Sequence, residues 1–323
     1  MNEASTISRV TPVHQTIESW LQRFLENHPA RAASLLMTVY GDAIAPHGGT
    51  LWLGSLIRLV APLGLNDRVV RTCVFRLSRE NWLRVQTEGR RSHYRLTTLG
   101  LRRFEAAWRR IYHRPIDDWS GNWHLVLLPA MLKGARREAL RKELQWIGYG
   151  ALASGVLAHP APDLVTLHEI LRETGTHDDV VIMQALTPDP SSGRPLKALV
   201  HDCWNLETIS AQYRRFIDGF RPILQALQQA DAPDARQCFL IQTLLMHAFR
   251  RTLLHDPQLP ARLLPADWSG GTARRLCEDI YRITFAPAQA HLLATCETLS
   301  GPMPAAAPYF YDRFGGLAEP AAR

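Results

Sequence analysis

The sequence has 323 residues, more than the roughly 100 to 200 of an ordinary domain, and therefore indicates two or three domains. Its 46% hydrophobic and 21% charged residues are typical of a globular protein, and no apolar run approaches the ~20 residues of a membrane helix. The 37 basic residues exceed the 30 acidic ones and give a net charge of +7, which is compatible with a polyanionic partner. The N-terminus lacks the features of a secretory signal, so we expect a cytoplasmic protein with no membrane partner.

The cysteines are scattered and contain no C-x-x-C pair. They are Cys73, Cys203, Cys238, Cys277 and Cys296. This spacing indicates neither a disulfide framework nor a zinc site, and we expect buried thiols, no metal and no cofactor.

The first elements that we predict are two helices joined by a short turn. Residues 51–60 (LWLGSLIRLV) have amphipathic spacing, and Pro62 and Gly64 should end and turn this helix. Asn66 is a good N-cap for the next helix, in NDRVVRTCVFRLSREN. Its apolar face comprises Val70, Cys73, Val74 and Leu77. Its other face carries Arg68, Arg71, Thr72, Phe75 and Arg76.

A β-hairpin is predicted directly after these helices, in WLRVQTEGRRSHYRLT. We place its turn at residues 87–89, where Gly89 can adopt a positive φ, so that Arg90 and Arg91 lie at an exposed tip. Helix, turn, helix and hairpin in this order indicate a winged helix-turn-helix, and arginine suits guanine edges and phosphates. The expected DNA-binding residues are Asn66, Arg68, Arg71, Thr72, Phe75, Arg76, Arg90, Arg91 and Ser92. Arg79 and Arg84 are expected to be solvated or structural, and the alternative is a small helical domain with a solvated arginine face.

The middle of the chain alternates predicted strands and helices. A strand over 123–128 precedes the helix KGARREALRKELQWIG, a Gly/Ala-rich candidate strand, a helix capped by Asp163 and the strand VVIMQALT. This order predicts a small ferredoxin-like α+β unit in which one strand is not placed. The segment PDPSSGRP over 188–195 is a predicted linker.

The remaining sequence has helical periodicity over 196–300, followed by a Gly- and Pro-rich segment. We therefore predict an α+β multidomain protein. Its parts are an N-terminal extension (1–29), a winged helix-turn-helix DNA-binding domain (30–112), a ferredoxin-like middle domain (113–188), a mainly α-helical C-terminal domain (189–300) and a flexible tail (301–323).

Taken together, these segments resemble the PaaX family of bacterial transcriptional repressors, which control phenylacetic acid degradation. The resemblance is carried by the run from LWLGSLIRLV to YRLTTLG and by WSGNWHLVLLP, RRIYHRP, WNLETISAQYRRFIDGF and FRRTLLHDPQLPARLLPADWSG. It implies a homodimer that represses catabolic genes and is released from operator DNA by phenylacetyl-CoA or a similar acyl-CoA. On the family pattern, Arg68, Arg71, Thr72 and Arg76 lie on the recognition helix and Arg90 and Arg91 on the wing. The sequence departs from that pattern at Asn205 and Ala248.

An acyl-CoA carries phosphates, an adenine ring and an apolar acyl end, so its site should combine arginines with aromatic side chains. One candidate cluster comprises Trp204, Tyr213, Arg214, Arg215 and Phe216, and another comprises Phe249, Arg250 and Arg251. A third is the basic helix face of Lys133, Arg136, Arg137, Arg141 and Lys142. Taken singly, each aromatic residue is better interpreted as helix core and each basic residue as part of a solvated face, and the sequence does not choose among the three clusters.

The sequence leaves two alternatives to a repressor function. A metal-dependent phosphohydrolase or nuclease-like protein could use the pairs His201-Asp202 and His255-Asp256 with Asp279, and an RNA-binding protein could use the basic helix. A metal site needs ligands that converge from several helices, whereas His255-Asp256 precedes Pro257 and should end a helix. The middle domain also resembles CRISPR-associated ferredoxin-like nucleases, but its first strand runs into Leu128-Pro129, without their metal-binding aspartate. We therefore expect no catalytic residues and no enzyme activity.

Overall fold

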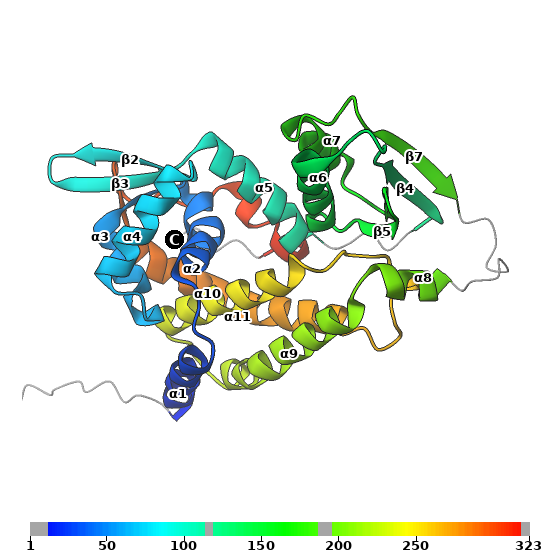
Figure 1. Ribbon diagram of the computed structural model, residues 1–323. Coiled ribbons are helices and arrows are strands. Elements are labelled where there is room, and N and C mark those ends of the chain that lie inside the picture. Colours follow the sequence, from blue (N-terminus) through cyan, green and yellow to red (C-terminus); the bar gives the residue numbers. More distant parts are fainter. Residues whose placement is uncertain (1–11, 114–118, 187–195, 318–323) are drawn as a thin grey trace, which may run out of the picture. The chain divides into compact units, whose positions relative to one another are not determined.

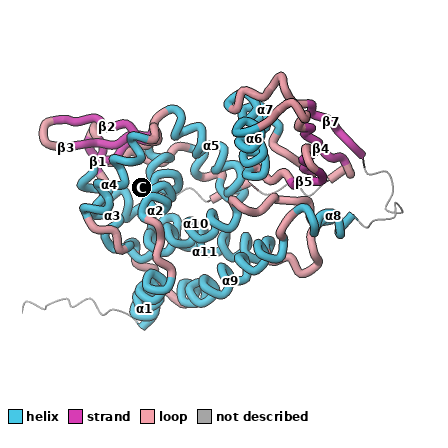
Figure 2. The backbone as a smooth tube through the Cα atoms, viewed as in Figure 1, coloured by secondary structure: helices cyan, strands magenta, loops and turns pink. Residues whose placement is uncertain are grey.

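The computed structural model describes residues 12–113, 119–186 and 196–317 as an α+β protein of helices and small antiparallel sheets (Figures 1 and 2). The chain divides into two compact units. The first comprises 1–113, 216–249 and 272–323, and the second comprises 114–215 and 250–271. Within the described ranges, none of the helices is both long and apolar enough to span a bilayer.

The first unit begins with helices and a three-stranded sheet. In chain order its elements are α1 (Pro12–Asn27), α2 (Ala32–Val39), the π-helix η1 (Tyr40–Ile44), the 3-10 turn η2 (Ala45–His47), β1 (Thr50–Trp52), α3 (Leu53–Val60), the 3-10 turn η3 (Ala61–Leu63), α4 (Asp67–Arg79), β2 (Leu83–Glu88), β3 (Arg91–Leu96) and α5 (Thr98–Tyr112). The strands are antiparallel in the order β1-β3-β2. The first predicted helix begins only at Leu53, because Thr50–Trp52 pairs with β3.

The second unit contains an antiparallel four-stranded sheet. Its elements are β4 (Asn122–Leu127), α6 (Gly134–Trp146), β5 (Gly150–Ala153), β6 (Val156–His159), α7 (Leu164–Glu173) and β7 (Val181–Leu186), and the strand order is β5-β6-β4-β7. The Gly/Ala-rich stretch forms the hairpin β5–β6, which supplies the strand that the sequence did not place. Asp163 caps α7 as expected, because its carboxylate accepts a hydrogen bond from the Val165 backbone at 3.0 Å. Buried side chains from the sheet and both helices form one core, among them Val126, Leu140, Leu157 and Leu167.

The later part of the chain is helical, as predicted, in α8 (Leu196–Cys203), α9 (Leu206–Gln228), α10 (Ala235–Leu253) and α11 (Gly270–Thr295). Helices α9, α10 and α11 each contribute residues to both compact units, so a division by compactness does not follow the successive segments expected from the sequence. The predicted linker at 188–195 lies outside the described residues.

The segment after Ser300 corrects the expectation of a flexible tail, as far as Leu317. It forms β9 (Gly301–Pro302), which pairs with β8 (Glu297–Thr298), and the 3-10 turns η5 (Pro308–Phe310) and η6 (Arg313–Gly315). Phe310, Arg313 and Phe314 are buried. Few periodic apolar residues and many glycines and prolines gave no sequence signal for this packing. Residues 318–323 lie outside the described part of the chain.

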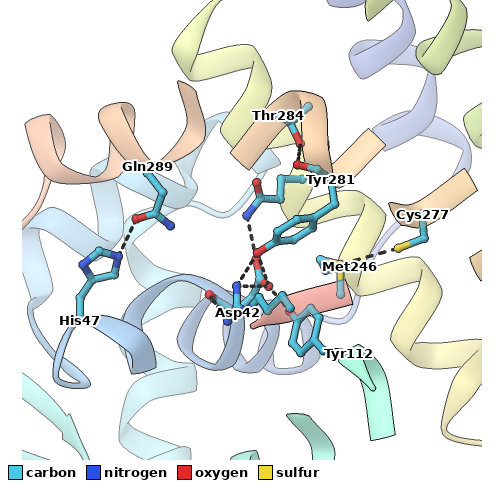
Figure 3. Close-up of polar contacts among 10 residues, drawn as sticks. Asp42, His47, Tyr112, Met246, Cys277, Tyr281, Thr284 and Gln289 are labelled. Atoms are coloured by element: carbon cyan, nitrogen blue, oxygen red, sulfur yellow. Dashed lines mark hydrogen bonds and ion pairs between the residues drawn. The ribbon is translucent and has the colours of Figure 1, made fainter. Parts of the chain in front are cut away.

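A buried ion pair between Asp42 of η1 and Arg313 of η6 joins distant parts of the first unit. Figure 3 shows Asp42 together with Tyr112 and Tyr281. The Arg313 side chain has no exposed surface, and its Nη1 donates to Asp42 Oδ1 at 3.2 Å while its Nη2 donates to the Asp42 backbone oxygen at 3.0 Å. The other carboxylate oxygen accepts from Gln242 Nε2 at 3.1 Å. One carboxylate thus receives donors from α10 and η6.

Two tyrosines complete this arrangement around Asp42. The hydroxyl groups of Tyr112 and Tyr281 both donate to Asp42 Oδ1, and the Tyr281 contact measures 3.3 Å. Burial raises the pKa of both tyrosines well above its usual value, so they stay protonated and act as donors. The Arg313 guanidinium also lies 4.4 Å from the ring centres of Tyr112 and Phe310, a cation–π arrangement.

We predict that Asp42→Ala lowers the free energy of unfolding by about 3 to 5 kcal/mol, because it leaves a buried guanidinium and two buried hydroxyl groups without their acceptor. Urea denaturation monitored by circular dichroism measures the effect. Arg236→Ala is the control: its ion pair with Glu18 spans 4.0 Å between exposed side chains, so the expected loss is below about 1 kcal/mol. Equal losses in the two variants would contradict the prediction.

Candidate nucleic-acid interface

Helices α3 and α4 are joined by a tight turn in the first unit. The 3-10 turn η3 contains Pro62, and Gly64 ends it with φ of +82°, a conformation that favours glycine. Asn66 then caps α4 by accepting a hydrogen bond from the Val69 backbone at 2.9 Å. Its amide oxygen therefore already has a structural role.

Helix α4 has one buried and one exposed face, as its spacing predicts. Val70, Val74 and Leu77 are buried, and Cys73 is half-buried. The opposite face is exposed and consists of Arg68, Arg71, Thr72, Phe75, Arg76 and Arg79.

Two arginines of the exposed face of α4 form ion pairs along the helix. Arg71 pairs with Asp67 one turn towards the N-terminus, and Arg76 pairs with Glu80 one turn towards the C-terminus, at 3.5 Å. All four side chains are more than half exposed, so solvent screens these pairs and they remain able to exchange for phosphate contacts.

The hairpin β2–β3 extends from the α3–α4 pair (Figure 1). Its turn consists of Gly89 and Arg90 alone, because Glu88 pairs with Arg91 in the sheet. The predicted turn at 87–89 is therefore wrong by one to two residues. Gly89 has φ of +56°, as expected for such a turn. Arg90 is exposed at the tip, and Ser92 is half-buried opposite Thr87.

Arg91 is held by two side chains that the sequence analysis did not identify. Its Nη1 lies 2.8 Å from Glu297 Oε2, and its guanidinium carbon lies 4.5 Å from the ring centre of Trp52. The Glu297 backbone nitrogen donates to Ser55 Oγ at 3.0 Å, which fixes β8 beside α3. Glu297 is 206 residues from Arg91 in the chain, so no local pattern could have revealed the pair.

Comparisons with known proteins agree with this organisation. Family models match three successive parts of the chain: PaaX-like protein over 31–100, PaaX protein central Cas2-like domain over 117–196, and PaaX-like protein C-terminal domain over 204–294. The chain is also 39% identical over 302 residues to the Transcriptional repressor PaaX of Escherichia coli (strain K12), covering 93% of this chain and 95% of that protein. The chain belongs to the PaaX family.

A solved structure gives a second comparison for this PaaX-family chain. The chain is similar to the solved structure of the uncharacterized protein Rv0674 from Mycobacterium tuberculosis, with a TM-score of 0.51 and 26% sequence identity. The match covers 82% of this chain and 98% of the other. The family assignment confirms the resemblance that the sequence segments carried.

The aromatic members of the effector clusters expected in this PaaX-family chain are buried. The Trp204 indole nitrogen donates to the Gly148 backbone oxygen at 2.8 Å, and the Tyr213 hydroxyl donates to Asp256 at 2.6 Å. The rings of Phe216 and Phe249 lie 5.5 Å apart. These contacts favour the interpretation of the aromatic residues as helix core. Among their basic neighbours, Arg214, Arg215 and Arg251 are exposed and Arg250 is half-buried.

The basic face of α6 is partly committed to structural contacts. Arg136 pairs with Asp179 at 2.7 Å. Arg137 Nη1 donates to the backbone oxygens of Leu128, Pro129 and Leu132 at 3.3, 3.0 and 3.3 Å. A guanidinium thus binds the carbonyl groups that follow β4, where the sequence shows no carboxylate. Lys133, Arg141 and Lys142 remain exposed.

The histidine–aspartate pairs make local contacts. His255 Nδ1 lies 2.8 Å from the Arg251 backbone oxygen, and Asp256 accepts from the Gln258 backbone at 2.7 Å. His201 Nδ1 lies 3.5 Å from Asp202 Oδ1, and His201 Nε2 lies 3.7 Å from Glu207 Oε1. Asp279 is exposed on α11. Over 12–113, 119–186 and 196–317, no three or more His, Cys, Asp or Glu side chains are grouped so that they could hold a metal ion.

Proposed function

We propose that this PaaX-family protein represses transcription by placing α4 in the major groove of operator DNA and the tip of the β2–β3 hairpin against the DNA backbone. The observation that carries the proposal is the exposed, arginine-bearing face of α4 beside a hairpin whose tip is also basic. Arginine binds guanine edges and phosphates through two parallel hydrogen bonds, which suits both positions. This assignment gives the protein no catalytic residues.

The fold supports two finer assignments within this proposal. We assign the segment 30–112 to a winged helix-turn-helix domain, because α3, the turn, α4 and the hairpin follow in the order of that fold. We assign 113–188 to a ferredoxin-like domain, because β4 to β7 with α6 and α7 follow the β-α-β-β-α-β order. The helical segment 189–300 is then the third domain.

We further propose a homodimer. One recognition helix contacts too few base pairs for useful specificity, whereas two helices related by a twofold axis contact half-sites about one helical turn, or a multiple of it, apart. Light scattering at micromolar concentration is expected to give twice the mass of one chain. A monomer both in solution and on DNA would contradict this prediction.

The proposed effector is phenylacetyl-CoA or a similar acyl-CoA, and the proposed targets are genes of phenylacetate catabolism. The E. coli relative's name and the family resemblance support this assignment. The exposed arginines Arg214, Arg215 and Arg251 are available to bind the phosphates of the ligand. The buried rings of Trp204, Tyr213 and Phe249 are available to it only through a rearrangement of the core.

A gel shift on the promoter region beside the gene of this protein tests both parts of the proposal. We expect a shifted band at moderate salt and its loss when phenylacetyl-CoA is added, because the ligand should stabilise the state that does not bind DNA. Absence of a shift without ligand would refute DNA binding. A shift that is insensitive to phenylacetyl-CoA would refute only the effector assignment.

The helix and the hairpin should contribute differently to binding. For at least one of Arg71 and Arg76, replacement by alanine should weaken the free energy of binding to the operator by ~1 to 3 kcal/mol, because a base contact is lost. The same variant should show a smaller preference for the operator over scrambled DNA. Arg90→Ala should instead weaken binding to both duplexes and reduce the salt slope by about one unit. Arg91→Ala should have a smaller effect on both the affinity and the salt slope, because Glu297 already compensates the charge of Arg91.

Affinities for operator and scrambled duplex across a salt series measure these effects. Arg262→Ala, which removes an exposed arginine in the second compact unit, is the control and should change neither affinity nor slope. If Arg90→Ala combined with Arg91→Ala leaves both quantities unchanged, the hairpin does not contact DNA.

A further inference from the structure

Phe75 is an exposed aromatic residue in the middle of the arginine-bearing face of α4. Its side chain is 64% exposed, the largest value among the exposed large hydrophobic residues of the described part of the first unit. Its neighbours one turn away on the same face are Arg71, Thr72 and Arg79. On the helix that we propose to enter the major groove, an exposed aromatic ring among arginines lies where it could contact an apolar group on a base edge.

Two arginines of the exposed face of α4 bind acidic residues nearer the two ends of the helix. Arg71 binds Asp67, towards the N-terminus of α4, and Arg76 binds Glu80, beyond its C-terminus. Phe75 and Thr72 lie between these two ion pairs on the exposed face. The Thr72 hydroxyl donates to the Arg68 backbone oxygen at 2.9 Å, so its hydrogen is not available to a base acceptor and its methyl group adds to the apolar surface.

The chemistry of the major groove restricts what such a surface can bind. Guanine, adenine and cytosine present donors and acceptors there, whereas thymine also presents its C5-methyl group. A phenyl ring placed against a polar base edge would remove water without replacing its hydrogen bonds, which is unfavourable. The positive charge on both sides of the ring favours a polyanion over an apolar protein surface as the partner.

We propose that Phe75, together with the Thr72 methyl group, recognises the C5-methyl group of a thymine at a fixed position of each operator half-site. This inference rests on the proposed DNA-binding function and adds a specificity-determining residue to it. Arg71 and Arg76 then set the helix over the groove, while the ring selects a T·A pair at its centre.

Replacing single thymines by uracil tests the inference, because uracil differs from thymine only by lacking that methyl group. The probe is a duplex that the wild-type protein selects from a random-sequence pool, and each thymine is replaced in turn. One buried methyl group contributes about 0.8 kcal/mol, so we expect about a fourfold loss of affinity at one position of each half-site. Phe75→Ala should bind the thymine and uracil duplexes equally at that position.

Two further variants make the result specific. Val85→Ala removes another exposed apolar side chain, 47% exposed on β2, and should retain the full sensitivity to uracil. Phe75→Leu keeps an apolar side chain and should retain part of it. Because Phe75 is exposed, circular dichroism should show all three variants folded.

The possible failures are distinguishable. If the wild-type protein selects a duplex but no uracil substitution weakens binding, or if Phe75→Ala keeps the sensitive position, the Phe75 inference is wrong while DNA binding stands. The same conclusion follows if Phe75→Ala changes only the mass of the protein in solution, which would place the ring in a contact between protein chains. If no duplex is selected over random DNA, the proposed function fails and the inference fails with it.

Discussion

The buried pair of Asp42 and Arg313 is the interaction on which the first compact unit depends. A carboxylate and a guanidinium removed from water each carry a desolvation cost of several kcal/mol, and only close partners offset it. Here the partners come from five segments: η1, α5, α10, α11 and η6. Because these donors reach Asp42 where the five segments meet, the pair contributes to how the segments are arranged as well as to their stability.

Continuous structure connects this arrangement with the proposed DNA-binding surface. Tyr112 is the last residue of α5, which follows the β2–β3 hairpin directly, and Tyr281 lies on α11, which leads to β8 and Glu297. Glu297 in turn holds Arg91 on the hairpin against Trp52. The position of the hairpin is thus determined from two sides, by α5 in sequence and by β8 in space.

How much of this could be predicted depended on whether the signal was local. The N-cap at Asn66, the apolar face at Val70 and Val74, and the positive φ of Gly89 all follow from a few neighbouring residues, and each was predicted. Pairing between strands determines the start of α3, the position of the β2–β3 turn and the strand of the β5–β6 hairpin that the sequence did not place. Hydrophobic periodicity does not report such pairing. The carboxylate partners of Arg91 and Arg313 lie more than 200 residues away, and no pattern within a segment could have supplied them.

The position of Arg313 in the chain also affects how the protein is made. Asp42 and Arg313 are separated by 271 residues, so a ribosome that adds ~5 to 20 residues per second needs roughly 15 to 50 seconds between the two. During that time Asp42, and Tyr112 once it has been made, lack the Arg313 guanidinium, and the unit that contains α4 lacks its central partner. A nascent chain released before Arg313 would carry the whole of α4 on an incompletely closed core. The core of the first unit is therefore closed only long after α4 has been synthesised.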